Sequence, residues 1–477
     1  MKQYDLIVLG GGAGGLTVAA GAASMGAKVA LIEKNAQPGG DCLHYGCVPS
    51  KALIHAAKKV HQARLSAEAF DLEVTGEADL LQALKRVKAA IAHIQKHDDA
   101  DRFRDMGVDV YIGRGSFQDD HHLMIEGGET IYGKRIVIST GSRPVIPPIE
   151  GLKETGYITN ETIFDLTYKP KRLFVIGAGV IGLELAQAMA RFGIEVTVAE
   201  ASSQLLGKED EELVPFIQSA LEKELKIMLN TKVQKVGKKE NGDKMILVEQ
   251  DGETKEILVD DILVATGRKP NTDRIGLDHT GVKTTDSGHI QVKPTLQTDR
   301  SHIYAIGDVL QAFPFTHAAG MEGKVVVSNA VFGLRRKVDY THVPWVIYTD
   351  PEVFHLGLTE KEAREQIGSD IQVYKVTLDE VDRFIADHET EGLVKVITDK
   401  KGKIVGAHAV GKEAGDWMQE IVFAKHHGHK IGDISHVIHP YPTHGAAVQR
   451  ASDQYWRNKL FSGAIPKLMK RYIRWFR

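Results

Sequence analysis

The sequence predicts an α/β protein with two Rossmann-like dinucleotide-binding domains, followed by a C-terminal α+β domain. A strand, a glycine-rich turn and a helix occur in this order twice, first near residue 4 and again near residue 173. A different pattern of alternating strands begins after residue 343 and indicates another architecture. The length of 477 residues agrees with about three domains at roughly 150 residues each.

The composition excludes several classes of protein. Hydrophobic residues make up 43% of the chain, and the formal net charge of −3 argues against a nucleic-acid-binding protein. Two cysteines exclude a secreted disulfide scaffold. The first strand begins at Tyr4 without an export signal, and no run approaches the ~18 apolar residues of a membrane span. We therefore expect a cytoplasmic protein.

The first glycine-rich turn follows a strand predicted at residues 4–9. It reads Gly10-x-Gly12-x-x-Gly15, and its glycines allow a tight turn, a close approach of the backbone to a pyrophosphate, and packing of the helix on the strand. Such a turn also occurs without a ligand, so alone it is a weak signal. The next strand ends on Glu33, at the distance expected for an acid that binds a ribose hydroxyl.

The same pattern returns later in the chain. Gly177-x-Gly179-x-x-Gly182 follows a strand, and the next strand ends on Glu200, at the same interval from its first glycine as in the first copy. Two fingerprints with matched acids predict that two dinucleotides bind. Between the two copies, residues 53–104 are expected to be helical, with the charged residues on a solvated face. Asn241-Gly242 predicts a hairpin turn.

The only two cysteines are five positions apart, at Cys42 and Cys47. In a regular α-helix this interval corresponds to a rise of about 7.5 Å, more than the usual Cα separation of about 4.4–6.8 Å in a disulfide. A bridge therefore needs an irregular backbone, which Gly46 and Pro49 favour. Two unrelated reduced cysteines are the alternative in a cytosolic chain. Without a nearby Cys/His pair the two thiolates cannot complete a tetrahedral metal shell, so we expect no metal site.

The cysteine segment resembles the active-site segment of the flavin-dependent pyridine nucleotide–disulfide oxidoreductases, the family of dihydrolipoamide dehydrogenase, glutathione reductase and mercuric reductase. It reads Gly39-Gly40-Asp41-Cys42-Leu43-His44-Tyr45-Gly46-Cys47-Val48-Pro49-Ser50-Lys51. The resemblance implies a redox-active disulfide in which Cys47, nearer the flavin, forms the charge-transfer thiolate and Cys42 exchanges with substrate. It also pairs Lys51 with Glu184 close to flavin N5, where a cation favours the reduced ring.

Further motifs of the family assign the two dinucleotides. The resemblance makes Thr140-Gly141 and Thr266-Gly267 the turns that close the two nucleotide-binding domains. It makes Asp308 the acid that holds the ribityl chain of FAD, and it places His317-Ala318 near the flavin pyrimidine. The predicted parts are an FAD-binding domain at 1–150 and 270–341, an NAD-binding domain at 151–269, a dimerisation domain at 342–455 and a basic amphipathic tail at 456–477.

The chain departs from the family near its C-terminal end. The family delivers a catalytic His-Glu dyad from the partner subunit in a His-Pro-Thr-x-x-Glu segment, but here Tyr441 replaces the histidine and Ala446 the glutamate. Tyrosine in this position resembles mercuric reductase, although the further C-terminal cysteine pair of that enzyme is missing. His439 or His444 could restore acid–base function. A metal site at the cluster His426, His427 and His429 is the less favoured alternative to surface histidines at a helix end.

The tail carries seven Lys/Arg and no acid from Arg457 to Arg477. Its cations recur at three-to-four spacing and leave much of the remaining surface to apolar and aromatic residues, which suits an anionic membrane surface. Packing on the protein itself is the alternative. The two sets are Lys467, Lys470, Arg471, Arg474 and Arg477, and Leu468, Met469, Tyr472, Ile473, Trp475 and Phe476.

Two hypotheses about function follow. The first is a homodimeric oxidoreductase with FAD and NAD that passes electrons from NADH to a disulfide, a metal ion or a quinone. Glu200 favours NADH, because its carboxylate would repel a 2′-phosphate and no arginine follows it at 201–206. The second is a membrane-tethered, redox-responsive binding protein whose NADH oxidation is slow and incidental. The missing dyad and the basic tail motivate this alternative.

Overall fold

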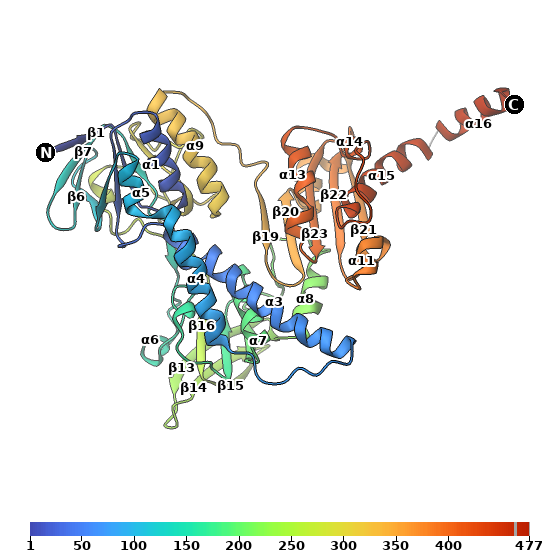
Figure 1. Cartoon of the computed structure of the whole chain (residues 1–477), viewed down its shortest axis with the longest axis horizontal. Coiled ribbons are helices and arrows are strands. Elements are labelled where there is room, and N and C mark those ends of the chain that lie inside the picture. Colours follow the sequence, from blue (N-terminus) through green and yellow to red (C-terminus); the bar gives the residue numbers. More distant parts are fainter. Residues whose placement is uncertain (462–464, 477) are drawn as a thin grey trace. The chain divides into compact units, whose positions relative to one another are not determined.

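The computed structural model describes residues 1–461 and 465–476 and confirms the predicted α/β class. The chain divides into two compact units. Unit 1 contains Met1–Ser202 and Lys226–Tyr340, and unit 2 contains Ser203–Leu225 and Thr341–Arg477. Figure 1 follows the chain by colour from the N-terminus to the C-terminus. The four domain boundaries predicted from the sequence stay predictions.

The first parallel sheet of unit 1 has the strand order β18-β8-β2-β3-β4. Its neighbouring strands are all parallel, and β2 and β3 are buried along their whole length, which explains their uninterrupted apolar sequences. β18 follows the strands of the second sheet in sequence, so the chain leaves the first sheet and later returns to it. The strands are β2 Leu6–Leu9, β3 Val29–Glu33, β4 Val108–Ile112, β8 Ile136–Ile138 and β18 Ile303–Ala305.

Helices α1 (Ala13–Ser24) and α9 (Thr316–Phe332) lie side by side in unit 1, although they come from distant parts of the chain (Figure 1). The small residues of α1 permit this approach: Gly14 and Gly21 face Ala319 and Val327 of α9 at distances that leave little room for a side chain. The predicted helix after the first strand is therefore confirmed, and its glycines also serve helix packing.

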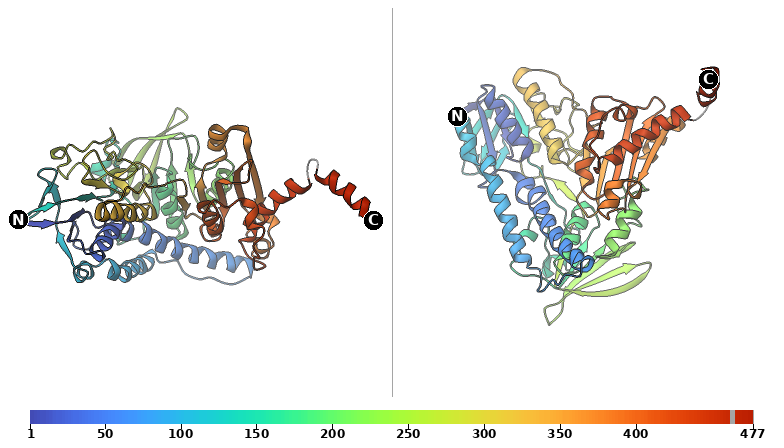
Figure 2. Two further views of the ribbon diagram at one scale, coloured as in Figure 1. Left: turned by 90° about the horizontal axis from the view of Figure 1, so that it is seen from above. Right: turned by 45° about the vertical axis from the view of Figure 1, so that its right-hand side comes forward.

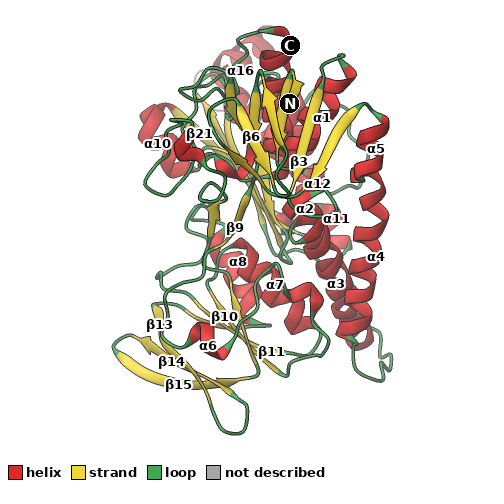
Figure 3. Ribbon diagram, turned by 90° about the vertical axis from the view of Figure 1, so that its left-hand side faces the viewer, coloured by secondary structure: helices red, strands yellow, loops and turns green. Residues whose placement is uncertain are grey.

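The region predicted to be helical at 53–104 is divided among α3 (Cys47–Ala69), α4 (Leu80–Asp98) and α5 (Ala100–Asp105). Figure 3 shows α3 and α4 as long helices that lie side by side. The break before α4 has a local cause, because the Asp79 carboxylate accepts hydrogen bonds from the first free backbone amides of that helix. Some of the charges assigned to a solvated face thus cap helices.

The second parallel sheet of unit 1 has the order β12-β11-β10-β16, and α7 (Val180–Arg191) follows β10. An antiparallel sheet β13-β14-β15 accompanies it, and the predicted hairpin turn is confirmed, with Gly242 at φ +93° between β13 and β14. The strands are β10 Arg172–Ile176, β11 Glu195–Ala199, β12 Lys226–Met228, β16 Asp261–Val264, β13 Thr231–Lys238, β14 Lys244–Gln250 and β15 Glu253–Val259.

Smaller elements complete unit 1. Strands β9 and β17 pair antiparallel where the chain passes between the two parallel sheets, and a further sheet has the order β1-β7-β6-β5. These elements are β1 Lys2–Tyr4, β5 Gly115–Phe117, β6 His122–Ile125, β7 Thr130–Gly133, β9 Ser142–Pro144, β17 Arg268–Pro270, α2 Gly40–His44 and α6 Leu152–Thr155.

Unit 2 is built on a five-stranded antiparallel sheet of order β19-β20-β23-β22-β21. Its helices include α12 and α13, which are interrupted at Met418. The elements are β19 Pro344–Ile347, β20 Glu352–Gly357, β21 Ile371–Thr377, β22 Leu393–Asp399, β23 Ile404–Gly411, α8 Val214–Glu222, α10 Glu360–Ile367, α11 Asp382–Ala386, α12 Ala414–Trp417, α13 Gln419–His426, α14 Ile431–Ile434, α15 Ala446–Phe461 and α16 Ile465–Phe476.

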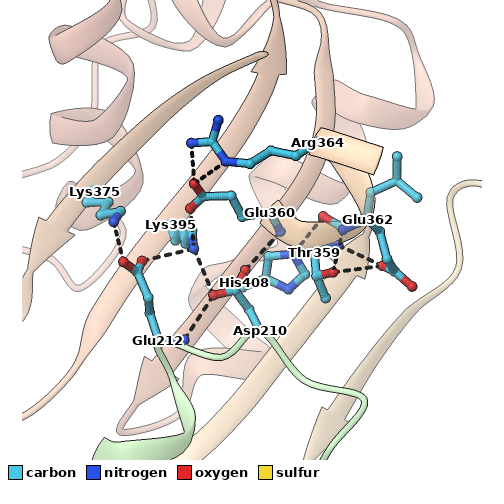
Figure 4. Close-up of polar contacts among 10 residues, drawn as sticks. Asp210, Glu212, Thr359, Glu360, Glu362, Arg364, Lys375, Lys395 and His408 are labelled. Carbon is cyan, nitrogen blue, oxygen red and sulfur yellow. Dashed lines mark hydrogen bonds and ion pairs between the residues drawn. The ribbon is translucent and has the colours of Figure 1, made fainter. Parts of the chain in front are cut away.

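The segment 203–225 lies between two strands of the second parallel sheet but packs in unit 2, which the sequence analysis did not anticipate. Figure 4 shows the cause: the Lys395 side chain, only 2% exposed, is surrounded by carboxylates. Its Nζ lies 2.8 Å from Asp210 Oδ1, 2.9 Å from Glu212 Oε2 and 2.6 Å from Glu360 Oε2. A buried cation needs such compensation, so Asp210 and Glu212 fix this segment on the sheet of unit 2.

Within the described residues, no helix combines the length and the apolar character needed to cross a bilayer. Figure 2 shows α15 and α16 as the red end of the ribbon. Among the described residues of α16, large apolar side chains stand exposed, and so do the cations Lys470, Arg471 and Arg474. The predicted tail helix is therefore present. The side chain of Lys467 and all of Arg477 lie outside the described residues.

Candidate functional site

The cysteine segment is divided between two helices of unit 1. Cys42 lies in α2, and Cys47 begins α3 after a break at Tyr45-Gly46. Both residues are thiols in the structure, and each shifts the acidity of the other. The hydroxyl Oγ1 of Thr316, at the start of α9, lies 3.3 Å from Cys47 Sγ. The irregular backbone that a Cys42–Cys47 bridge requires is thus present.

The two thiols have different acidities. A hydrogen bond from Cys42 lowers the pKa of Cys47 to about 6, against the effect of burial and with help from Thr316 and Lys51. The same hydrogen bond, together with burial, raises the pKa of Cys42. Near neutral pH the pair therefore holds a thiolate on Cys47 and a proton on Cys42. A thiolate is the nucleophilic and electron-rich form of cysteine, so the geometry prepares Cys47 for redox chemistry.

An ion pair stands one helical turn beyond Cys47. Lys51 Nζ of α3 donates to Glu184 Oε2 of α7 at 2.8 Å, and the Glu184 side chain is only 4% exposed. This is the pair that the resemblance predicted. It brings a cation from the cysteine helix together with the helix of the second glycine fingerprint.

The first glycine fingerprint borders a cavity of about 250 Å³ in unit 1. A Cβ at Gly10 would lie 2.4 Å from Ser139 O, and one at Gly15 would lie 2.0 Å from Gly10 O, so both glycines are required by packing. A Cβ at Gly12 would meet only Gly40 Cα, at 3.8 Å, and this glycine faces the cavity. The one open glycine is the one that a pyrophosphate must approach.

The predicted acid and turn lie at the same cavity. Glu33 is buried and accepts hydrogen bonds from the backbone amides of Gly11 at 2.7 Å and Asn35 at 2.8 Å. Gly141 lines the cavity with φ +69°. The backbone and polar groups of a nucleotide site are therefore present, and they fit the adenosine and pyrophosphate of a dinucleotide.

Asp308 is connected to this cavity by hydrogen bonds and ion pairs of side chains that the sequence did not indicate. Ser142 donates to Asp308 Oδ2 at 2.6 Å, and Arg268 donates from Nε to Ser142 Oγ at 2.8 Å. Arg268 also lies 3.0 Å from Asp41 Oδ1, and burial raises the pKa of that carboxyl. The position of Arg268, directly after the predicted Gly267, was the available signal. No sequence feature distinguished Ser142 or Asp41 as a contact of this cavity.

Glu322 was also missed. Its carboxylate is buried in α9, accepts hydrogen bonds from Gly307 N and from the Tyr340 hydroxyl, each at 2.6 Å, and has a pKa raised to about 7 by burial. It holds the backbone directly before Asp308. The predicted Ala318 is buried in the first turn of the same helix. A signal for Glu322 existed, because it is the single acid of this helix.

The second glycine fingerprint repeats the geometry of the first. A Cβ at Gly177 would lie 2.6 Å from Ala265 O, and one at Gly182 would lie 2.1 Å from Gly177 O. Nothing lies within 4 Å of the Cβ position at Gly179 or at Gly267. A second pyrophosphate therefore has the same open approach. The structure places this fingerprint on the second parallel sheet, as predicted.

Glu200 directly follows β11, and its carboxylate faces the second glycine-rich turn. It accepts hydrogen bonds from Ser202 N and Ala178 N, both at 2.9 Å, which lower its pKa although burial opposes them. The group is thus a carboxylate at neutral pH. This charge suits a free ribose hydroxyl and disfavours a phosphate.

Tyr441 lies in unit 2 and is exposed, and its hydroxyl donates to Asp382 Oδ2 at 2.9 Å. His439 pairs with Glu420 at 2.9 Å, and His444 pairs with Asp387 at 3.0 Å. Each histidine next to Tyr441 therefore has a carboxylate partner of its own. Ala446 begins α15 and supplies no carboxylate.

One group of metal-ligand residues occurs within the described part of the chain, formed by Asp120, His121 and His302. The two imidazole rings are stacked, with centroids 4.0 Å apart and planes at 12°. Their lone pairs therefore do not converge on one point, and we assign no metal site to them. The cluster His426, His427 and His429 is not among the described groups whose ligand atoms come close together.

Comparisons with known proteins agree with this geometry. Residues 4–323 match the pyridine nucleotide-disulphide oxidoreductase family model, and residues 343–452 match the dimerisation domain of the same family. The chain is 35% identical over 453 residues to a mercuric reductase of Staphylococcus aureus, covering 94% of this chain and 82% of that protein. It is 37% identical over 470 residues to a dihydrolipoyl dehydrogenase of Thermus scotoductus, covering 95% and 97%.

A solved structure has the same fold. The copper(II) complex of the HOCl-induced flavoprotein disulfide reductase RclA from Escherichia coli superposes with a TM-score of 0.84 at 28% sequence identity. The match covers 95% of this chain and 100% of that chain. The resemblance read from the sequence is thereby confirmed at the level of the family.

Proposed function

Because the chain belongs to the pyridine nucleotide-disulphide oxidoreductase family, we propose that it passes electrons from NADH through FAD to the Cys42–Cys47 pair and on to a small acceptor. Members of this family use FAD and NAD(P)H. The observation that carries the proposal is the position of Cys47, whose Sγ lies 3.3 Å from Thr316 Oγ1 and one turn from the Lys51–Glu184 ion pair. The lowered pKa of Cys47 agrees with it. The two cysteines would cycle between a disulfide and a dithiol.

The proposal gives each nucleotide its own domain, with the boundaries predicted from the sequence. FAD, when bound, supplies the coupling between hydride transfer and thiol–disulfide chemistry, which no side chain can perform. Lys51 holds a positive charge near that group, Cys47 holds the thiolate and Cys42 holds the exchangeable proton. The proposed FAD residues are Gly10, Gly12, Gly15, Glu33, Gly141, Asp308 and Ala318, and the proposed NAD residues are Gly177, Gly179, Gly182, Glu200 and Gly267.

The acceptor that we favour is a soft metal ion. Exchange with a disulfide needs a base and acid beside Cys42, and neither Tyr441 nor Ala446 provides one near neutral pH. A metal ion needs thiolate ligands more than a proton shuttle. Relatives named mercuric reductase and a neighbouring structure named as a copper(II) complex support this choice. A small disulfide or a quinone is the other acceptor that the proposal allows.

We further propose a cytoplasmic homodimer that attaches peripherally to anionic membranes. The match to a dimerisation domain supports the homodimer. The exposed apolar and basic side chains of α16 support the membrane contact, because a free helix of this kind lies at the headgroup boundary.

A panel of NADH-coupled assays tests the function. The purified FAD-loaded protein is given mercuric and cupric ions, lipoamide, glutathione disulfide and quinones in turn, and saturable turnover with one of them is expected. The same turnover must be lost in Cys42→Ser and Cys47→Ser. If every acceptor gives only slow, unsaturable NADH oxidation, the alternative of a membrane-tethered, redox-responsive binding protein replaces the enzyme.

A further inference from the structure

A pocket of about 700 Å³ opens in unit 2 between β21, α15 and the turn that joins β22 to β23. Tyr374 and Tyr455 are buried beneath it, with ring centroids 6.2 Å apart at an angle of 67°. Four exposed lysines surround the opening: Lys400, Lys401, Lys430 and Lys459. The pocket thus combines an aromatic floor with a cationic rim.

Acidic residues near the rim neutralise only part of this charge. Lys400 pairs with Asp370 at 2.7 Å. Asp399 Oδ1 accepts hydrogen bonds from the backbone amides of Lys401 and Lys403, at 2.8 and 2.9 Å. These bonds fix the turn between β22 and β23. Lys459 Nζ lies 5.1 Å from the centre of the Trp456 ring and donates to the Tyr455 hydroxyl at 3.3 Å. Its ammonium group is therefore held over the aromatic floor by neutral partners.

The pocket lies close in sequence to α16, and this position favours a membrane lipid as its ligand. Lys459 lies in the last turn of α15, where Leu460 and Phe461 expose apolar surface, and α16 begins at Ile465. A membrane that carries α16 on its surface is therefore within a few residues of the pocket. Lysine ammonium groups bind phosphate as point charges, and Trp456 is of the type that favours the membrane boundary.

We propose that this pocket binds the phosphate headgroup of an anionic phospholipid. The inference rests on the proposed membrane contact of α16 and adds a headgroup site to it. The phosphate would lie among Lys401, Lys430 and Lys459, with the glycerol part against Tyr455.

The test compares full-length, FAD-loaded protein with two double variants of equal charge change. Lys401→Ala/Lys430→Ala removes two cations of the pocket, and Lys232→Ala/Lys238→Ala removes two exposed lysines of β13 as a control. Cosedimentation is measured with vesicles of phosphatidylglycerol and phosphatidylcholine. Each surface cation contributes on the order of 1 kcal/mol, so the pocket variant should bind roughly 30-fold more weakly and the control variant almost unchanged. Equal binding of both variants overturns the pocket and leaves the tail proposal intact.

A soluble probe separates the two proposals. Dihexanoyl-phosphatidylglycerol, below its micelle concentration, should quench Trp456 fluorescence in the wild type and not in the pocket variant. If the protein binds the probe but does not bind vesicles, the membrane role of α16 is wrong and the headgroup site is supported. If inorganic pyrophosphate binds the pocket better than the probe does, the ligand is a free phosphate and the lipid assignment is wrong.

Discussion

The Sγ atom of Cys47 lies 3.3 Å from the Oγ1 atom of Thr316, although 269 positions separate the two residues. The contact joins the first turn of α3 to the first turn of α9 and places a hydroxyl beside the thiol whose pKa is lowered to about 6. A hydroxyl that donates to a thiolate stabilises the charged form. The acidity of Cys47 should therefore depend on Thr316.

We predict that the alkylation rate of Cys47 in the reduced protein rises with pH and reaches half its maximum near pH 6. Below this pH the sulfur is a thiol and reacts slowly. In Thr316→Val the midpoint should move upward by roughly one pKa unit, because a hydrogen bond to a charged group contributes about 1.5–3 kcal/mol. Mass spectrometry after iodoacetamide pulses distinguishes Cys47 from Cys42. Thr316→Ser should keep the wild-type midpoint, and an equal shift in both variants would show that the hydroxyl is irrelevant.

The ion pair of Lys51 and Glu184 should contribute to stability. In Lys51→Met the carboxylate of Glu184, 4% exposed, loses the cation at 2.8 Å. A broken buried pair costs about 3–5 kcal/mol, and the partial exposure of Lys51 reduces this to roughly 2 kcal/mol. Urea unfolding of the FAD-loaded protein measures the loss. Lys51→Met/Glu184→Leu should recover most of it, and a double variant as unstable as the single one would contradict the role of the pair.

NADH should be preferred to NADPH because of Glu200. Its carboxylate is held in the charged form by two backbone amides, and it would repel a 2′-phosphate. Measured kcat/KM should favour NADH by at least tenfold, and Glu200→Ser should narrow this ratio mainly by improving NADPH. The variant Glu195→Ser, at the exposed start of the same strand, is the control. A wild-type preference for NADPH would refute the assignment.

Lipoamide should be a poor substrate near pH 7. The raised pKa of Cys42 keeps a proton on the thiol that we propose exchanges with substrate, and both dyad positions are empty. General acid–base catalysis typically contributes about 10²–10⁴-fold, so Tyr441→His/Ala446→Glu should raise turnover by tenfold or more. Tyr441→His alone should do less, since the histidine then lacks its carboxylate. High wild-type turnover that survives replacement of His439 and His444 would show that the departure from the family is harmless.

The fold could be predicted from the sequence where one local pattern determines a local structure. The two glycine fingerprints fix a strand, a turn and a helix through short-range sterics, and both sit on parallel sheets as expected. The segment 203–225 could not be placed in this way. Its position in unit 2 depends on Asp210 meeting Lys395, and the pair comes from residues 185 positions apart. From the sequence alone, a charged residue does not reveal whether it will face water or form an ion pair with a buried residue in the folded protein.

The residues of the candidate site also differ in whether the sequence could identify them. The sequence identified Cys42, Cys47 and Glu33, because each lies in a motif whose spacing indicates a chemical role. Thr316 and Arg268 act through contacts made only after folding, because their partners belong to other elements. Their sequence neighbours, His317 and Gly267, carried the recognised motifs. A search for donors adjacent to a motif would have found both residues.

The exposed face of α16 should direct the protein to anionic membranes. Its cations Lys470, Arg471 and Arg474 are exposed, and so are apolar side chains such as Trp475 (86%) and Phe476 (75%). Three cations at about 1 kcal/mol each correspond to more than 100-fold in vesicle affinity. Lys470→Ala/Arg471→Ala/Arg474→Ala should therefore lose binding to anionic vesicles by that factor.

The same experiment distinguishes the membrane from the alternative, in which the helix packs on the protein or its dimer. Cosedimentation with phosphatidylglycerol vesicles should fall at high salt, since exposed charges are screened within about 10 Å at 0.1 M salt. Trp475→Ala/Phe476→Ala should weaken binding and leave the dimer intact in gel filtration, because these rings enter the headgroup boundary in our proposal. Dissociation of the dimer in this variant, or equal binding of the wild type to neutral vesicles, would instead assign α16 to the protein's own assembly.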